Sequence, residues 1–150
     1  MPRSEGPDTR VELKARALRY LVRREHSRAE LARKLAPHAE SVQMLQAVLE
    51  ELLEKRQLSD ERYAEARTHW LSRKYGAARI RQDLKAHGVA DAVAERVSAE
   101  GDLEKARAIL ARKYRAPALT REEKARRARF LQSRGFSLDV VQRLLLRAED

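Results

Sequence analysis

An internal repeat constrains the fold of this chain more than any other feature of its sequence. Five positions recur 47 residues apart: Leu84, Gly88, Val89, Val93 and Val97 return as Leu131, Gly135, Phe136, Val140 and Leu144. Part of the pattern also occurs 49 residues earlier, at Leu35, Met44 and Val48. Chance matches arise in any leucine-rich helical chain, but a glycine at the same turn of two copies argues against chance. Periods of about 40–50 residues are typical of helical units that bury faces on their neighbours.

The residue composition favours helix along the whole chain. Only 5 of the 150 residues are Gly and 4 are Pro. Ala, Leu, Arg, Glu and Lys dominate, and these are strong helix formers. β-branched residues never alternate over the length of a strand. We therefore predict an all-α fold, built of three tandem three-helix repeats that form an elongated, curved array.

Capping and breaking residues predict nine helices with short connections. The sequences Ser27–Glu30 and Thr120–Glu123 are capping boxes, whose hydroxyl and carboxylate satisfy backbone N–H groups at a helix start. The other expected caps are Asp8 or Thr9, Ser41, the loop 58–61, Asp91, Asp102, and Ser137 or Asp139. The expected helix ends are marked by Pro37, Gly76, Gly88, Gly101, Pro117 and Gly135. The sixth helix is thus expected to extend past Val97 to Gly101.

The repeat divides the chain into a tail and three units. We expect a loose tail at residues 1–8, followed by three-helix repeats at 9–58, 59–101 and 102–150. The segment Arg73–Tyr75 recurs only 39 residues later as Arg112–Tyr114, so the third repeat carries about eight additional residues near 115–122. A curved array presents a long concave surface, which suits a large or filamentous partner.

A surplus of positive charge points to an acidic partner. Lys and Arg number 33 and Asp and Glu 23, which gives a formal net charge of +10. This surplus favours nucleic acid or an acidic protein, without distinguishing them. Segments 73–85 and 121–134 each carry a local net charge of +4. The candidate contacts with a filament or DNA are Arg24, Arg28, Arg73, Lys74, Arg79, Arg81, Lys85, Lys124, Arg126, Arg127, Arg129 and Arg134.

The same basic residues also fit a solvated helix face. Because residues advance by about 100° along a helix, Arg79 and Arg81 lie about 200° apart and do not share a face. The aromatic side chains are expected to pack in the core rather than to stack on bases: Tyr20, Tyr63, Trp70, Tyr75, Tyr114, Phe130 and Phe136.

No residue constellation typical of an enzyme is present in the sequence. The histidines form no metal-binding pair, and we interpret them as solvated or capping side chains: His26, His38, His69 and His87. Glycine-rich phosphate loops are absent, and most carboxylates have Arg or Lys at helical spacing. We therefore expect no catalytic, metal or cofactor site. With no cysteine, no apolar run of about 18 residues and no secretory signal, the chain is expected to be cytoplasmic.

Four segments follow one another in the order and at the separations of a known family. They are 17–21 with Arg24 and 27–31, then 58–64, then 76–84 with Gly88 and Val89, and finally 129–137. Together they resemble the RecX family of recombinase regulators. The resemblance implies three tandem three-helix repeats that bind the RecA–DNA nucleoprotein filament, in or along its groove. It also implies inhibition of ATP hydrolysis and strand exchange, a role in DNA repair, recombination and the SOS response, and no catalytic residues.

Two features depart from the family pattern. Ala77 stands where the family often has Pro, in a first helical turn that suits either residue. Residues 1–8 match nothing. Two other functions stay open, namely a helix-turn-helix-like protein that binds DNA directly and a helical scaffold for an acidic protein. We expect a monomer, and the sequence leaves open which basic residues contact DNA and which contact RecA.

Overall fold

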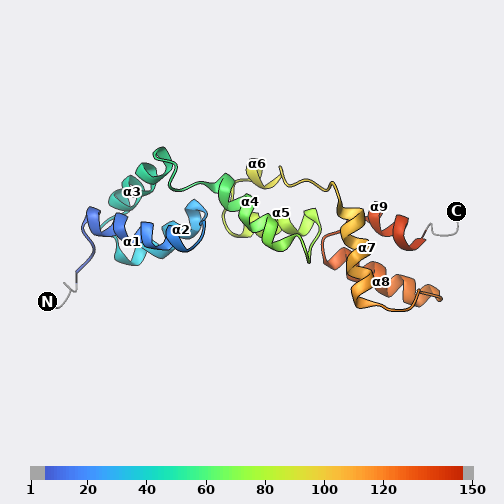
Figure 1. Cartoon of the computed structure of the whole chain (residues 1–150). Coiled ribbons are helices and arrows are strands. Elements are labelled where there is room, and N and C mark those ends of the chain that lie inside the picture. The colour runs from blue at the N-terminus through green and yellow to red at the C-terminus, as the bar shows by residue number, and fades with distance from the viewer. Residues whose placement is uncertain (1–5, 147–150) are drawn as a thin grey trace. The chain divides into compact units, whose positions relative to one another are not determined.

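The fold is helical throughout the part of the chain that the structure describes. A computed structural model describes residues 6–146, except for the side chain of Leu146. No β-strand occurs in that range, although Asp8 and Ala39 form an isolated bridge. The elements are α1 (Arg10–Arg23), α2 (Arg28–Leu35), η1 (Ala36–His38), α3 (Val42–Glu54), α4 (Asp60–Leu71), α5 (Ala77–Ala86), α6 (Asp91–Ala94), α7 (Asp102–Lys113), α8 (Arg121–Ser133), α9 (Leu138–Val141) and η2 (Gln142–Leu146) (Figure 1). The prediction of an all-α fold is confirmed.

Most helix starts lie where the capping residues predict them. Ser41, Ser59 and Ser137 each accept a hydrogen bond from the backbone N–H three residues on. Complete capping boxes open three helices, formed by Thr9 with Glu12, Ser27 with Glu30, and Thr120 with Glu123. Of the two residues expected to cap α1, Thr9 is therefore the cap. Asp8 instead accepts a hydrogen bond from Nε of Arg16 at 2.8 Å.

The predicted end of the sixth helix is wrong. Helix α6 ends at Ala94 and does not reach Gly101. The backbone beyond it forms separate turns, in which the N–H of Val97 donates to Ala94 and that of Asp102 donates to Ala99. Bonds between residues three apart replace the α-helical ladder, so Val97 lies outside a regular helix.

Asp102 caps a different helix from the one predicted. Gly101 is the N-cap of α7, and Asp102 is its first residue. The Asp102 carboxylate, 4% exposed, accepts a hydrogen bond at 3.1 Å from the N–H of Ala77, the first residue of α5. Its other oxygen lies 3.3 Å from Nζ of Lys105. The cap thus joins two helix starts that are 25 residues apart in sequence.

Contacts divide the chain into two compact units. Unit 1 comprises Met1–Ala66 and Lys85–Val93, and unit 2 comprises Arg67–Leu84 and Ala94–Asp150. Helices α4 and α5 therefore contribute residues to both units.

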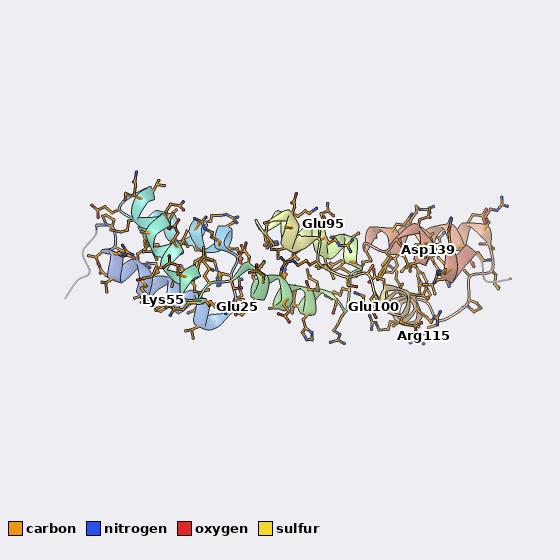
Figure 2. All side chains as sticks on the ribbon, turned by 90° about the horizontal axis from the view of Figure 1, so that it is seen from above. Glu25, Lys55, Glu95, Glu100, Arg115 and Asp139 are labelled. Carbon is orange, nitrogen blue, oxygen red and sulfur yellow. The ribbon has the colours of Figure 1, made fainter. Side chains whose placement is uncertain are left out.

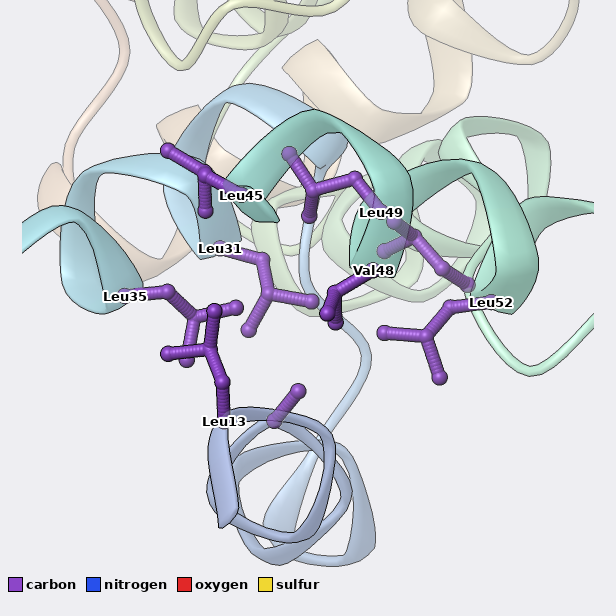
Figure 3. Close-up of a cluster of buried hydrophobic side chains, with 9 residues drawn as sticks. Leu13, Leu31, Leu35, Leu45, Val48, Leu49 and Leu52 are labelled. Atoms are coloured by element: carbon purple, nitrogen blue, oxygen red, sulfur yellow. The ribbon is translucent and has the colours of Figure 1, made fainter. Parts of the chain in front are cut away.

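The core of unit 1 is formed by one face of each of its first three helices. Leu13 of α1 points toward Leu31 and Leu35 of α2 and toward the apolar face of α3 (Figure 3). The α3 residues in this cluster are Leu45, Val48, Leu49 and Leu52. Their spacing of three and four residues places them on one side of the helix, as the sequence predicts.

The core of unit 2 lies between α7, α8 and α9. It contains Ala106, Ile109, Leu131, Phe136, Val141 and Leu145, with Phe130 partly buried against them. The expected packing of both phenylalanines is confirmed.

The two recurring glycines lie at equivalent helix contacts. In unit 1, Gly88 has φ +84°, and a Cβ added there would lie 2.3 Å from Cβ of Ala29 in α2. In unit 2, Gly135 has φ +90°, and an added Cβ would lie 2.3 Å from Cβ of Arg79 in α5. Only glycine combines a left-handed backbone with so close an approach. Each glycine turn thus receives the start of a helix from the preceding repeat, which explains why the glycine recurs.

Candidate functional site

Arg24 and Arg28 lie at the α1–α2 connection and contact side chains of unit 1. The Arg24 guanidinium donates two hydrogen bonds to Glu30, at 3.1 and 2.9 Å. Burial raises the pKa of Glu30, but hydrogen bonds from Arg24 and the Ser27 backbone bring that pKa below its ordinary value. Arg28 donates to the side-chain oxygen of Gln46. The Arg24 guanidinium therefore already binds a carboxylate of its own unit.

Arg79 and Arg134 connect two segments of unit 2. Arg79 donates to the carbonyl of Ser133 at 2.7 Å, and Arg134 donates to the carbonyl of Lys74 at 3.3 Å. Both guanidinium groups lie over the ring of Tyr75, at 4.8 and 5.5 Å from its centroid. The two guanidinium groups satisfy backbone carbonyls at the end of α8 and just after the end of α4, and they stack on an aromatic face, so both residues stabilise the unit.

Arg81 and Arg127 are also held by backbone carbonyls of unit 2. Arg81 donates to Val97 at 3.0 Å. Arg127 donates to Ala116 at 2.8 Å and lies 4.2 Å from the centroid of the Tyr114 ring. Replacing either arginine would therefore disturb internal contacts as well as surface charge.

The remaining candidates differ in their exposure. Four of them are exposed and form no salt bridge among residues 6–146: Arg73, Lys74, Arg126 and Arg129. Lys85 is also exposed, whereas Lys124 is half-buried. Long nitrogen-tipped side chains project outward from the helices (Figure 2). An exposed cation without an internal partner can approach a phosphate or carboxylate at no cost to the fold.

A cationic cleft of about 740 Å³ lies beside the C-terminal end of α4 in unit 2. Its lining contains one carboxylate, Asp83, and five cationic side chains: Arg67, Arg73, Lys74, Arg79 and Arg112. Arg67 donates to both oxygens of Asp83, at 2.9 and 3.1 Å, so the carboxylate is already neutralised. Arg112 donates to the carbonyl of Arg73 at 3.1 Å. The structure thus brings three predicted candidates, Arg73, Lys74 and Arg79, together with Arg67 and Arg112, which were not predicted from the sequence.

Trp70 also lines the cleft, and its predicted burial in the core is wrong. It is 70% exposed. Trp70 follows Tyr63 by seven residues, which places both on nearly the same helical direction, and Tyr63 is indeed buried. Helix α4 ends one residue later, however, and Leu71 is the buried side chain at that end. The useful sequence signal is the pair of cations three and four residues after the tryptophan, Arg73 and Lys74.

Of the two roles predicted for the histidines, solvated or capping, His26 has the capping role. It is buried, and its Nδ1 lies 3.0 Å from the carbonyl oxygen of Arg24, the C-cap of α1. It therefore caps α1 from inside the unit. Residues 6–146 contain no group of three or more His, Asp or Glu side chains that is suited to a metal ion. None of the helices in that range is long and apolar enough to cross a bilayer.

Fold and surface together define a basic, all-helical protein built of tandem three-helix domains. Profiles of the first, second and third three-helix domains of RecX match residues 14–52, 59–97 and 100–145. The chain therefore belongs to the RecX family, and the three-repeat architecture predicted from its sequence is confirmed.

Individual relatives agree with this assignment. The chain is 44% identical to the regulatory protein RecX of Ralstonia nicotianae over 95% of its length and 92% of the relative. It is 46% identical to the regulatory protein RecX of Leptothrix cholodnii, over 93% and 90% of the two chains. The crystal structure of RecX from Lactobacillus salivarius has the same fold, with a TM-score of 0.81 at 21% identity, over 93% of this chain and 96% of that one.

Proposed function

We propose that this chain binds the filament that the RecA recombinase forms on DNA and inhibits its ATP hydrolysis and strand exchange. Membership of a family of regulatory proteins named RecX is the observation that carries the proposal. The chain would act in the cytoplasm as a monomer without catalysing a reaction. Through this inhibition it would regulate recombination, DNA repair and the SOS response.

Exposed cations supply the binding energy in this proposal. Arg73 and Lys74 in unit 2 and Arg126 and Arg129 on α8 are exposed and form no salt bridge with the residues that the structure describes. DNA phosphates and acidic side chains of RecA are the complementary groups, because arginine binds both with paired hydrogen bonds. Inhibition follows from occupancy: a bound chain obstructs the rearrangement of RecA subunits or the entry of duplex DNA.

Co-sedimentation with RecA filaments tests the proposed binding. The chain is expected to sediment with RecA filaments on single-stranded DNA more strongly than with the same DNA alone. The double variant Arg126→Gln, Arg129→Gln should bind filaments more weakly and unfold at an unchanged temperature, because both side chains are exposed. Equal binding to filaments and naked duplex DNA, with a steep salt dependence, would favour a direct DNA-binding protein instead.

The choice of variants follows from the contacts in unit 2. Reversing the charge of Arg79, Arg81 or Arg127 would remove internal hydrogen bonds, so weaker binding by such a variant could reflect unfolding. A matched control is Arg107→Gln, which removes one exposed charge that is paired with Glu104 on α7. This control should leave filament binding unchanged.

A further inference from the structure

We propose that the cationic cleft of unit 2 is a binding site for single-stranded DNA, in which Trp70 stacks on a base and Arg73, Lys74 and Arg112 contact the phosphates. The inference rests on the proposed function, since it gives the chain a direct contact with DNA inside the filament. It adds a defined site and base stacking as the mode of recognition, whereas the sequence predicts aromatic side chains packed in the core.

Trp70 presents most of its indole ring to solvent. A tryptophan that is 70% exposed leaves a large apolar surface in water and marks a contact site. The Arg67 guanidinium lies 5.0 Å from the centroid of the indole ring. Two hydrogen bonds to Asp83 hold Arg67 in place. The ring therefore has one face supported by an anchored planar cation, and the rest of its surface open to a ligand.

Positive charge surrounds the indole in the cleft. Among the described residues that line the cleft, Asp83 is the one carboxylate, and Arg67 neutralises it. Arg73, Lys74 and Arg112 therefore present positive charge beside an aromatic platform. This combination is how proteins hold unpaired nucleic acid: cations follow the backbone, and aromatic rings stack on successive bases.

A single strand of DNA is the ligand that matches both the indole and the cations. An acidic peptide would satisfy the cations but offers no flat surface for the indole. Duplex DNA keeps its base faces covered by neighbouring pairs, whereas a single strand exposes them. The cleft volume of about 740 Å³ also lies within the usual range for sites that hold small organic ligands, so one or two nucleotides fit.

Quenching of the intrinsic fluorescence tests the site directly, because Trp70 is the only tryptophan of the chain. The full-length chain is titrated with an oligothymidylate of about six nucleotides, a length within the site sizes of known single-strand binders. Stacking should quench the emission in a saturable way. The same length of abasic sugar–phosphate carries the phosphates without bases, and it should leave the emission nearly unchanged.

Binding of a labelled oligothymidylate separates stacking from charge. Trp70→Ala should weaken the affinity about 5- to 100-fold, and Trp70→Phe should restore most of it. The double variant Arg73→Gln, Lys74→Gln should flatten the salt dependence by about 1.4 log units per log unit of salt. The control Arg19→Gln, Arg23→Gln removes two exposed charges from α1 and should leave the slope unchanged.

Several results would overturn the site. They are an absence of quenching by oligothymidylate, equal quenching by the abasic strand or by polyglutamate, and equal affinity of Trp70→Ala and the unchanged chain. Because the assay contains no RecA, its failure leaves inhibition of RecA filaments intact. Conversely, quenching by DNA without inhibition of filaments would retain the site and reject the proposed function.

Discussion

Among single residues, His26 is a buried histidine with two specific polar contacts. Its Nδ1 lies 3.0 Å from the Arg24 carbonyl, and its Nε2 lies 2.9 Å from Nζ of Lys34. Because an ammonium only donates, Nε2 accepts from Lys34, and these contacts assign the proton to Nδ1. Burial, with the nearby charges of Arg24 and Lys34, lowers the pKa of His26 below its ordinary value of 6.5, while the Arg24 carbonyl and Glu30 oppose this.

This lowered pKa predicts a loss of stability in mild acid. Well above pH 6.5 His26 is neutral in the folded and unfolded chain, so it adds no pH dependence there. As the pH falls below 6.5, the unfolded chain takes up a proton first, and the free energy of unfolding decreases by up to about 1.4 kcal/mol per pH unit. The decrease ends once the pH passes the folded-state pKa. Urea unfolding across this range measures it.

Two histidine variants control this prediction. His26→Gln should lose the component that begins at pH 6.5, while replacing the exposed His69 by Gln should not. If both variants show the same pH dependence as the unchanged chain, His26 does not cause it.

The buried cap at Ala77 gives a second prediction at the residue scale. Ala77→Pro fits the first helical turn but removes the N–H that Asp102 accepts. A buried carboxylate oxygen without its donor should cost about 1–3 kcal/mol in the free energy of unfolding. The family's frequent proline at this position is therefore not equivalent to alanine in this chain.

A double-mutant cycle with Asp102→Ala isolates the cap. Once the carboxylate is absent, Ala77→Pro should cost much less than it does alone, and denaturant unfolding of the four chains gives the coupling. Additive effects would mean that the hydrogen bond contributes nothing.

At the scale of helices and turns, the glycine contacts predict a large difference between two similar substitutions. Gly135→Ala places a Cβ 2.3 Å from Cβ of Arg79 and also strains a backbone with φ +90°. The free energy of unfolding should therefore fall by about 2–5 kcal/mol. Gly101→Ala meets the same kind of strain at φ +84° but has no atom within 4 Å, and it should cost about 1–2 kcal/mol. Equal losses in denaturant unfolding would mean that the contact with α5 is unimportant.

The helices and their caps follow from local sequence, whereas contacts between distant segments do not. Ser27 and Thr120 cap helices through residues within three positions of their own, and these roles were predictable. The cap that Asp102 gives to α5 depends on a contact 25 residues away. The end of α6 depends on turn bonds that compete with a helix of similar local propensity, so the composition favoured the longer helix.

The candidate site was only partly predictable for the same reason. Charge counts selected Arg73 and Lys74, but they could not separate them from Arg79 and Arg81, which donate to backbone carbonyls. Helical periodicity assigned Trp70 to the core, because periodicity does not tell where the packed part of a helix ends. Exposure of the tryptophan changes the expected chemistry from packing to stacking.

For the molecule as a whole, part of the net positive charge is held in contacts within the fold, and only the remaining cations are available to a partner. Several of the 33 basic residues stabilise the fold. Arg24, for example, forms a salt bridge with Glu30, and Arg134 donates a hydrogen bond to the carbonyl of Lys74. Both units nevertheless retain exposed cations, including Arg33 and Arg56 in unit 1 and Arg126 in unit 2. A partner that carries negative charge over a long distance can engage both units together, and a nucleoprotein filament is such a partner.

Inhibition of RecA filaments is tested most directly by their rate of ATP hydrolysis. RecA assembled on single-stranded DNA is titrated with the full chain at fixed salt, while sedimentation in parallel reports how much chain is bound. The expected result is a saturable fall in the hydrolysis rate that follows the bound fraction. A rate that stays unchanged when the filaments are saturated with the chain would contradict the proposed function.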